Sequence, residues 1–169
     1  PEGTRFEPLV RELFFKDDAN HDPLMVLADD GFYWELYDAK KPLTAGPIDL
    51  MAADDQKFWG HVVGGAVRDR MFKHVESAFR IFEEAWAEHP DEVTLVDLKI
   101  EDGFDAATGV LRIGDVIDND SWRIWPKGKK ALDMSKQVYR DLPEVTDEVL
   151  KQIQAKYAWV AQATEQFVA

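Results

Sequence analysis

The sequence predicts an α/β domain of the α+β type, in which a mixed or antiparallel sheet is packed against helices. Two apolar-rich runs, 95–101 and 110–117, flank a polar turn at 105–109 that contains a glycine. This spacing is typical of a β-hairpin. Two further segments, 68–87 and 146–167, repeat large apolar side chains every three or four residues, as amphipathic helices do.

The two predicted helices carry recognisable boundaries. The first is followed by Pro90, which lies beyond its end. Its apolar stripe consists of Phe72, Val75, Phe79, Phe82 and Trp86. The second begins near Thr146, whose hydroxyl suits an N-terminal cap, and acidic residues follow in its first turn. The stripe of the first helix indicates ordinary core packing.

Composition narrows the class of protein. With 169 residues, 46% of them hydrophobic, the chain can form one domain with a sizeable core. The absence of cysteine excludes disulfides, thiolate metal sites and cysteine nucleophiles, and it fits a cytoplasmic protein. The chain begins at Pro1 rather than at a methionine, so we expect a fragment, a processed chain or part of a larger protein.

The net charge of −13 restricts the ligands. It argues against nucleic acid or an anionic membrane as the main partner. A polyanionic ligand such as a nucleotide would need a bound cation and nearby lysine or arginine. The four histidines lack the paired spacing of a zinc site, so we expect each to be a surface or hydrogen-bonded core residue.

The first apolar run alternates, so its side chains point to opposite faces of a strand. One face holds Val96, Leu98 and Ile100, and the other holds Asp97, Lys99 and Glu101. If Phe104 pairs with Val110, Asp115 of the second run lies opposite Lys99, and a shift by two residues places Asp115 opposite Glu101. Both registers put Asp115 on the charged face, whereas a slip of one residue would reverse this.

Two interpretations of this charged face remain open. Opposed residues lie about 5 Å apart and diagonal ones roughly 7–8 Å, so Glu101 and Asp115 could share one Mg²⁺, which takes oxygen ligands. Alternatively, Lys99 and Asp115 form an ordinary cross-strand ion pair on the surface.

The N-terminal third is less regular. Residues 9–15 predict a short strand, and the polar loop that follows carries Asp18, Asn20 and Asp22 at the spacing of a calcium loop. Pro23 stands where that loop requires glycine, which argues against a calcium site and favours a substrate-binding loop or a surface turn. The segment 24–55 predicts loops with short elements, and its aromatic residues a local core or an interface.

Three blocks of the sequence together resemble the SAICAR synthetase family, the phosphoribosylaminoimidazole-succinocarboxamide synthases of the purine pathway. The blocks are Glu12–Pro23, Leu95–Gly103, and Gly114–Pro126 followed by Lys136–Leu142. The third block is especially similar to the synthetase part of the bifunctional animal enzyme. The resemblance implies that residues 1–169 are the C-terminal, ATP-grasp-like domain of such an enzyme.

The resemblance implies roles for individual residues. Lys99 contacts the nucleotide, while Glu101 and Asp115 serve Mg²⁺-ATP, and these three form the catalytic set. Asp120 and Arg123 meet the imidazole ribonucleotide. The guanidinium fork of Arg123 suits a carboxylate or phosphate there. Lys16, Asp18 and Asp22 lie in a loop on the substrate side. The implied reaction joins L-aspartate to 5-aminoimidazole-4-carboxylate ribonucleotide and converts ATP to ADP and phosphate.

The sequence also departs from the family pattern. Asp102 stands where relatives usually have an apolar residue, which would add a carboxylate beside Glu101, and Ser135 replaces a frequent aspartate. Residues 24–55 read as an insertion. The family's N-terminal part, which covers the nucleotide, is not in this sequence, so we expect half a site. The resemblance also implies a homo-oligomeric enzyme. A non-catalytic nucleotide-binding or assembly domain is the alternative.

Overall fold

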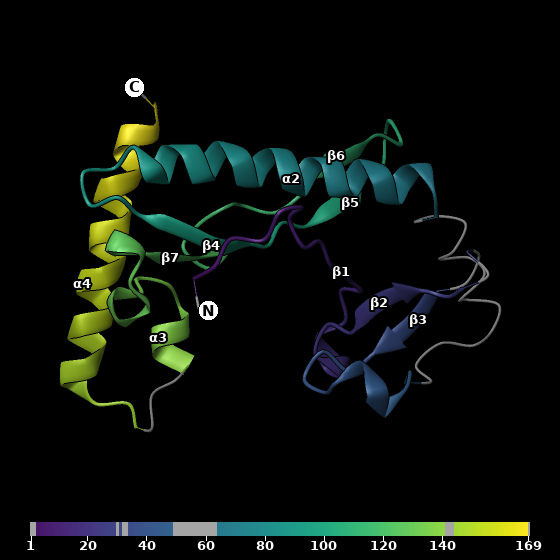
Figure 1. Ribbon diagram of the computed structural model, residues 1–169, viewed down its shortest axis with the longest axis horizontal. Coiled ribbons are helices and arrows are strands. Elements are labelled where there is room, and N and C mark those ends of the chain that lie inside the picture. Colours follow the sequence, from purple (N-terminus) through teal and green to yellow (C-terminus); the bar gives the residue numbers. More distant parts are fainter. Residues whose placement is uncertain (1–2, 30, 32–33, 49–63, 141–143, 169) are drawn as a thin grey trace. The chain divides into compact units, whose positions relative to one another are not determined.

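The computed structural model describes residues 3–29, 31, 34–48, 64–140 and 144–168. The chain divides into two compact units, Phe6–Phe72 and a second that combines Pro1–Arg5 with Lys73–Ala169. Figure 1 follows the order of the elements along the chain. Among the described residues, no helix is both long and apolar enough to cross a membrane.

The unit 6–72 is built on a small antiparallel sheet. Its strands are β1 (Leu13–Phe14), β2 (Leu24–Leu27) and β3 (Trp34–Tyr37), in the order β1-β2-β3. Met25, Trp34 and Leu36 form its buried core. The strand predicted within 9–15 is therefore present but short, and Trp34 confirms the local core expected of this aromatic segment. Phe32, Tyr33 and residues 49–63 lie outside the described residues, and the insertion at 24–55 stays a prediction.

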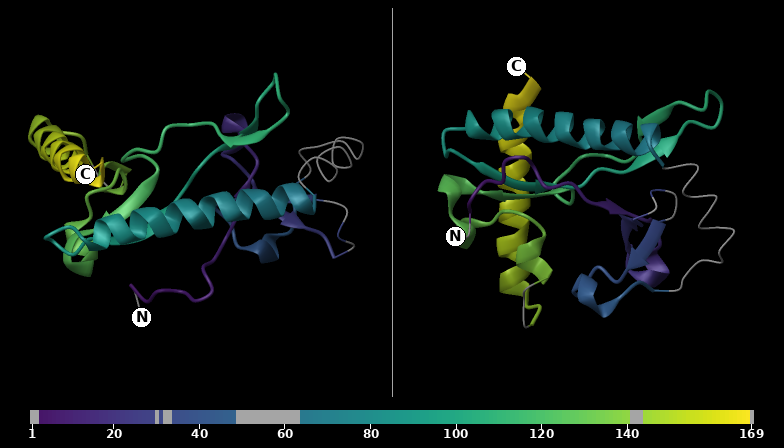
Figure 2. Two further views of the ribbon diagram at one scale, coloured as in Figure 1. Left: turned by 90° about the horizontal axis from the view of Figure 1, so that it is seen from above. Right: turned by 45° about the vertical axis from the view of Figure 1, so that its right-hand side comes forward.

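The unit that contains residues 73–169 has a larger core around two helices and a strand pair. The helices are α2 (Ala66–Ala87) and α4 (Asp147–Thr164), and the strands are β4 (Thr94–Leu98) and β7 (Trp122–Trp125). Figures 1 and 2 show the two helices at a steep angle to each other beside this strand pair. The strands β5 (Asp102–Phe104) and β6 (Leu111–Ile113) form a second antiparallel pair, and the short helix α3 spans Gln137–Arg140.

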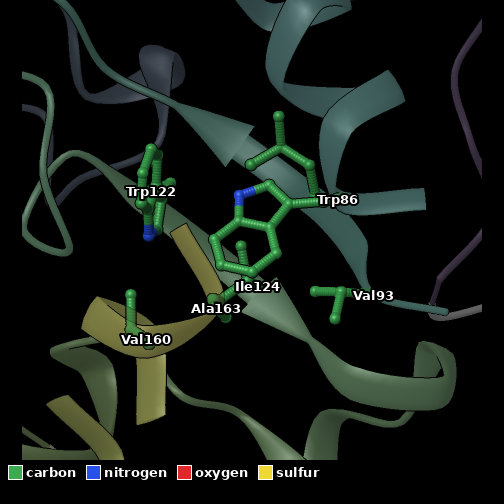
Figure 3. Packing of buried hydrophobic residues seen from close by; sticks show 7 residues of the cluster. Trp86, Val93, Trp122, Ile124, Val160 and Ala163 are labelled. Atoms are coloured by element: carbon green, nitrogen blue, oxygen red, sulfur yellow. The ribbon is translucent and has the colours of Figure 1, made fainter. Parts of the chain in front are cut away.

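Side chains from both helices and from β7 meet in this core, among them Trp86 of α2, Trp122 of β7 and Val160 of α4 (Figure 3). Trp86 of α2 is fully buried, and its ring packs edge-on against Trp122 with centroids 5.6 Å apart. Phe82, from the predicted stripe, also packs on Trp122, at 5.3 Å. The helical periodicity therefore identified Phe79, Phe82 and Trp86 as core residues correctly, whereas Phe72 and Val75 are not part of this cluster.

Three of the four predicted helix ends are confirmed within two residues, whereas α4 ends at Thr164 and a 3-10 turn, Glu165–Val168, continues to the predicted end at 167. Helix α2 begins at Ala66 rather than Arg68 and ends at Ala87. Thr146 is the N-cap of α4, because its Oγ1 accepts a hydrogen bond from the backbone N–H of Val149 (3.3 Å). Every strand pair that the structure describes is antiparallel, which selects the antiparallel form of the expected sheet.

The predicted hairpin is wrong in its register. Phe104 pairs with Leu111 rather than Val110, one residue away from the expected pairing. The cause lies in the turn, where the N–H of Asp105 donates to the carbonyl of Val110 (2.9 Å). The Asp105 carboxylate also accepts from the backbone N–H and hydroxyl of Thr108 (2.8 and 2.7 Å). These bonds bring Asp105 into the ladder and leave a four-residue turn.

The first run is also divided between two partners. Its early part, β4, pairs with β7 and not with the second run. A bulge between Leu95 and Asp97 breaks the alternation of side chains along this strand. An extra residue in one strand has this effect because it shifts the two-residue period. As a result, Leu95 and Leu98 both contact the core. The prediction that Val96 and Leu98 share one face is therefore wrong.

Candidate functional site

A cavity of about 250 Å³ lies where the two strand pairs meet. Its walls come from the segment between β4 and β5, from the loop between β6 and β7, and from the residue just before α3. The lining residues are Lys99, Ile100, Glu101, Asp115, Val116, Asp118, Asp120, Ser121 and Lys136. Four of the residues predicted for a site, Lys99, Glu101, Asp115 and Asp120, are therefore brought together.

The segment 99–101 is held by backbone hydrogen bonds at both ends. The N–H of Lys99 donates to the carbonyl of Ser121 (2.7 Å), which extends the β4–β7 ladder. The N–H of Gly114 donates to the carbonyl of Glu101 (2.8 Å), which extends the β5–β6 ladder. Lys99 and Glu101 are two residues apart on an extended segment and form an ion pair, with Nζ and Oε1 3.3 Å apart. Both charged groups thus reach the cavity from one face.

Asp115 reaches the same cavity by a different route from the one predicted. The one-residue slip was expected to turn Asp115 away from Lys99 and Glu101. Strand β6 ends at Ile113, however, and Asp115 lies in the loop beyond it. The loop carries Asp115 back to the cavity, where its Oδ1 accepts a hydrogen bond from the N–H of Val116 (2.8 Å). The grouping of these residues is confirmed, although the hairpin face that predicted it is not.

The loop 115–121 is folded tightly and tied to the core. The Asp118 carboxylate accepts from the N–H of Asp120 (2.8 Å), and the Ser121 hydroxyl donates to the carbonyl of Val116 (3.3 Å). Asn119 is 8% exposed, and it accepts from Trp122 Nε1 (3.0 Å) and donates to the carbonyl of Met134 (3.1 Å). Sequence reasoning missed Asn119, because only the fold brings Met134 beside it.

The cavity is acidic overall. Two lysines and four carboxylates line it, so its formal charge is +2 − 4 = −2. A polyphosphate would therefore need a divalent cation here, and the carboxylates of Glu101 and Asp115 are ligands of the kind that Mg²⁺ takes. Within the described ranges, no group of three or more histidine, aspartate or glutamate residues forms a metal cage of its own. This donor set fits Mg²⁺ that is completed by substrate phosphates and water.

A helical tyrosine supports one wall of the cavity. The hydroxyl of Tyr157 on α4 donates to Oδ1 of Asp120 (2.9 Å). Burial raises the pKa of Tyr157 to about 12, and the hydrogen bond and the negative charges of Asp120 and Asp118 act in the same direction. Tyr157 belongs to the segment 146–167, for which the sequence predicted only an apolar helical stripe. Its hydroxyl could have been a signal, since tyrosine combines an apolar ring with a polar group that needs a partner.

Arg123 lies outside the lining of this cavity. It sits on β7 opposite Asp97 of β4, and its Nε donates to Asp97 Oδ2 (2.7 Å) while Nη2 donates to the same oxygen. This hydrogen bond raises the pKa of the Arg123 guanidinium, which stays charged. A ligand carboxylate or phosphate at Arg123 would have to share the guanidinium with Asp97.

The three other predicted substrate residues belong to the unit 6–72. Lys16 Nζ lies 2.6 Å from Asp18 Oδ1 and 3.5 Å from Asp22 Oδ2, so the three form one charged cluster. Asp22 also accepts from the N–H of Asp17 (2.9 Å), and Asp17 caps the short 3-10 helix Asp18–Asn20. These contacts agree with a structured surface turn, and the substrate role of the cluster stays a prediction.

The two departures from the family pattern have structural partners. The Asp102 side chain does not stand beside Glu101 as expected; it is 4% exposed and lies 2.6 Å from His74 Nδ1 on α2. Ser135 is 2% exposed, and its hydroxyl accepts from the N–H of Gln137 (3.3 Å) at the start of α3. Side chains alternate along a strand, so Asp102 points away from the face of Glu101.

Comparisons with known proteins agree with the resemblance in the sequence. The family model described as SAICAR synthetase matches residues 49–156. The phosphoribosylaminoimidazole-succinocarboxamide synthase of Roseiflexus sp. (strain RS-1) is 42% identical over 167 residues, which cover 99% of this chain and 55% of that protein. The bifunctional phosphoribosylaminoimidazole carboxylase/phosphoribosylaminoimidazole succinocarboxamide synthetase of Rattus norvegicus is 40% identical over 97% of this chain and 33% of its own length.

Solved structures share the fold. A structure titled SAICAR synthetase (Type-2) in complex with ADP matches with a TM-score of 0.52 and 21% identity, over 88% of this chain and 50% of that one. The SAICAR synthetase of Pyrococcus horikoshii OT3 matches with a TM-score of 0.51 and 20% identity. The chain spans about half the length of the single-function relatives it matches. Since the family model covers more than half of its residues, the chain belongs to the SAICAR synthetase family.

Proposed function

We propose that the protein carrying this chain is a cytoplasmic, ATP-dependent carbon–nitrogen ligase of de novo purine biosynthesis. It joins L-aspartate to 5-aminoimidazole-4-carboxylate ribonucleotide and releases SAICAR, ADP and phosphate. The observation that carries the proposal is the acidic cavity, in which Lys99, Glu101 and Asp115 lie together in a chain of this family. The ADP named for one structure of the same fold supports a nucleotide there.

The reaction explains why the cavity combines lysine with carboxylates. A carboxylate is a poor electrophile, so ATP transfers its γ-phosphoryl group to the ribonucleotide carboxylate and ADP leaves. The amine of aspartate then attacks the acyl phosphate, phosphate leaves and an amide forms. The protein contributes positioning and charge neutralisation rather than a covalent nucleophile. Lys99 neutralises phosphate oxygens in this scheme, and Asp120 positions the ribonucleotide.

Glu101 and Asp115 would hold Mg²⁺, and a bound Mg²⁺ would neutralise charge on the phosphates of ATP. The ion pair from Lys99 keeps Glu101 oriented toward the cavity before the nucleotide arrives. The formal charge of −2 makes nucleotide binding depend on the cation. Arg123 would contact the ribonucleotide while it shares its guanidinium with Asp97.

A complete nucleotide site would need residues beyond those that line this cavity. The cavity of about 250 Å³ is smaller than the roughly 300–1,000 Å³ of complete ligand pockets. We propose that the N-terminal part of the same enzyme covers the nucleotide, and that the enzyme is a homo-oligomer. Lys16, Asp18 and Asp22 contribute to the substrate side in this arrangement.

The test uses the full-length protein that carries this chain. SAICAR and ADP are expected only when ATP, aspartate and the ribonucleotide are all present. Glu101→Gln keeps the shape but removes the charge, and turnover should fall by about 100-fold or more. Glu83→Gln is a matched control, because Glu83 is a half-buried glutamate of α2 that pairs with Arg5. Undiminished turnover in Glu101→Gln contradicts the proposed metal role.

A second candidate function is a non-catalytic nucleotide-binding or assembly domain. The small volume of the cavity favours it. Intact mass measurement of the protein from its source separates the two. A single species near 19.3 kDa without a companion chain favours the non-catalytic domain. A heavier chain or a second polypeptide favours the ligase.

A further inference from the structure

Strand β5, which directly follows Glu101, is attached to helix α2 by a buried polar contact. His74 Nδ1 lies 2.6 Å from Asp102 Oδ1, across 28 residues of sequence. The side chain of Asp102 is 4% exposed and that of His74 28%. A carboxylate accepts hydrogen bonds, so His74 donates from Nδ1. A charge-assisted bond in such a shielded place is among the stronger polar contacts in proteins.

The contact lies directly behind the cavity. Asp102 is the first residue of β5 and the immediate neighbour of Glu101, which lines the cavity. Because successive side chains of a strand point to opposite faces, fixing Asp102 on one face orients Glu101 on the other. The carbonyl of Glu101 accepts from the N–H of Gly114, one residue before Asp115. One anchored backbone segment therefore sets the positions of both carboxylates.

Of the residues described in β5 and β6, Leu111 is the one buried apolar residue, at 6% exposed. The two strands have three residues each, and Phe104 and Ile113 are 48% and 41% exposed. A two-stranded hairpin is marginally stable by itself. Its contact with α2 through His74 thus has a large effect on where the segment lies.

We propose that His74 and Asp102 are positioning residues, which act through Glu101 to hold the cavity's carboxylates in the arrangement that binds the metal–nucleotide complex. The proposal rests on the proposed function for its ligand and on the hydrogen bond for its mechanism. Outer residues that orient a metal ligand typically change metal affinity or activity by about 10–100-fold. His74 and Asp102 touch neither substrate nor metal in this proposal.

The first experiment measures the anchoring without reference to activity. Hydrogen exchange at the amide of Gly114 reports its bond to Glu101. In the full-length protein, Asp102→Leu and His74→Leu should each speed this exchange by about 10-fold, and the double variant by no more than either single one. Asp102→Asn keeps an oxygen that accepts from His74 and should restore most of the protection. Unchanged exchange in both single variants overturns the proposal, whatever the ligand.

The second experiment tests the route through Glu101. The probe is Mn²⁺ with ATP, and the affinity for Mn²⁺ is measured in the same variants. Asp102→Leu should weaken binding by about 10-fold in the wild-type background and have no further effect when Glu101→Gln is present. Equal losses in both backgrounds show a general structural role and overturn the proposal.

The two proposals fail in different ways. If the wild-type protein binds no Mn²⁺ with ATP and forms no SAICAR, the proposed function is wrong, and exchange at Gly114 still decides the anchoring. Glu76→Gln is the matched control, since Glu76 pairs with Arg80 elsewhere on α2. It should change neither exchange nor affinity.

Discussion

Two acidic loops of this chain, 16–22 and 115–121, have similar composition but different surroundings. In the first, Asp17 accepts hydrogen bonds from the N–H of Ala19 and the amide of Asn20, and Asp22 accepts from the N–H of Asp17. These carboxylates close the loop on itself. In the second, Asn119 ties the loop to the core, and the carboxylates border a cavity with two lysines on other segments.

Acidic residues at similar spacing acquire their role from what surrounds them. A carboxylate that caps a turn contributes to stability, whereas one beside a cavity and a lysine is available for a ligand. Substitution of the capping residue Asp17 in the first loop should therefore change stability, and substitution of a cavity carboxylate in the second should change chemistry. Each of the following predictions tests this contrast.

The largest effect is expected at Asp115. Asp115→Asn should lower ligase turnover in the full-length protein by about 100-fold or more, because it removes a negative charge at the proposed cation site. Its free energy of unfolding, measured in urea, should stay within about 0.5 kcal/mol of wild type, since Asp115 is exposed. A large loss of stability at this position would break the contrast between the loops.

A smaller effect is expected at Asn119, which connects the second loop to the core. Asn119→Ala removes both side-chain bonds and leaves Trp122 Nε1 and the carbonyl of Met134 without these partners. The expected loss is about 2 kcal/mol in the free energy of unfolding. Asn119→Asp keeps an oxygen that accepts from Trp122 but places a buried carboxylate against the carbonyl of Met134, so at neutral pH it should lose at least as much. Urea denaturation with tryptophan fluorescence measures both.

The sequence predicted the helices well because their apolar periods run over many residues and average out local exceptions. Phe82 and Trp86 were recognised as core in this way, and Thr146 as a cap from its own chemistry. The hairpin register was not predictable by the same means. A single side chain, that of Asp105, shifted it by one residue through bonds within the turn.

The candidate site was predicted in part, and through the resemblance more than through the strand pattern. Lys99 and Glu101 share a face because they are two residues apart on an extended segment. Asp115 joins them through a loop, whose path a periodic pattern does not specify. Tyr157 and His74 were missed as partners of acidic residues, because each contact joins segments far apart in the sequence.

The cap of the first loop provides the opposite case to Asp115. Asp17→Ala should lower the free energy of unfolding by about 1 kcal/mol, because the bonds to Ala19 and Asn20 are lost. The affinity for Mn²⁺ with ATP at the second loop should be unchanged. Asp17→Asn retains an oxygen at the cap and should recover most of the stability. A loss of nucleotide affinity in Asp17→Ala would show that the two loops are not independent.

The smallest effect is expected at Tyr157, whose hydroxyl supports Asp120 from outside the cavity. Its pKa is about 12 in the folded protein and about 10 in an unfolded chain. The folded state holds the proton more tightly, so this stabilisation is present below about pH 10 and is lost as the pH rises through about 12. Tyr157→Phe should remove this part of the pH dependence between pH 10 and 12, although lysine titration continues in both proteins. The Michaelis constant for the ribonucleotide should rise only a few-fold, because Asp120 keeps its place in the cavity and loses only a supporting hydrogen bond from outside it. Parallel urea titrations at pH 9 and pH 11 measure the difference, and identical pH dependence in the two proteins would show that the Asp120 contact does not influence Tyr157.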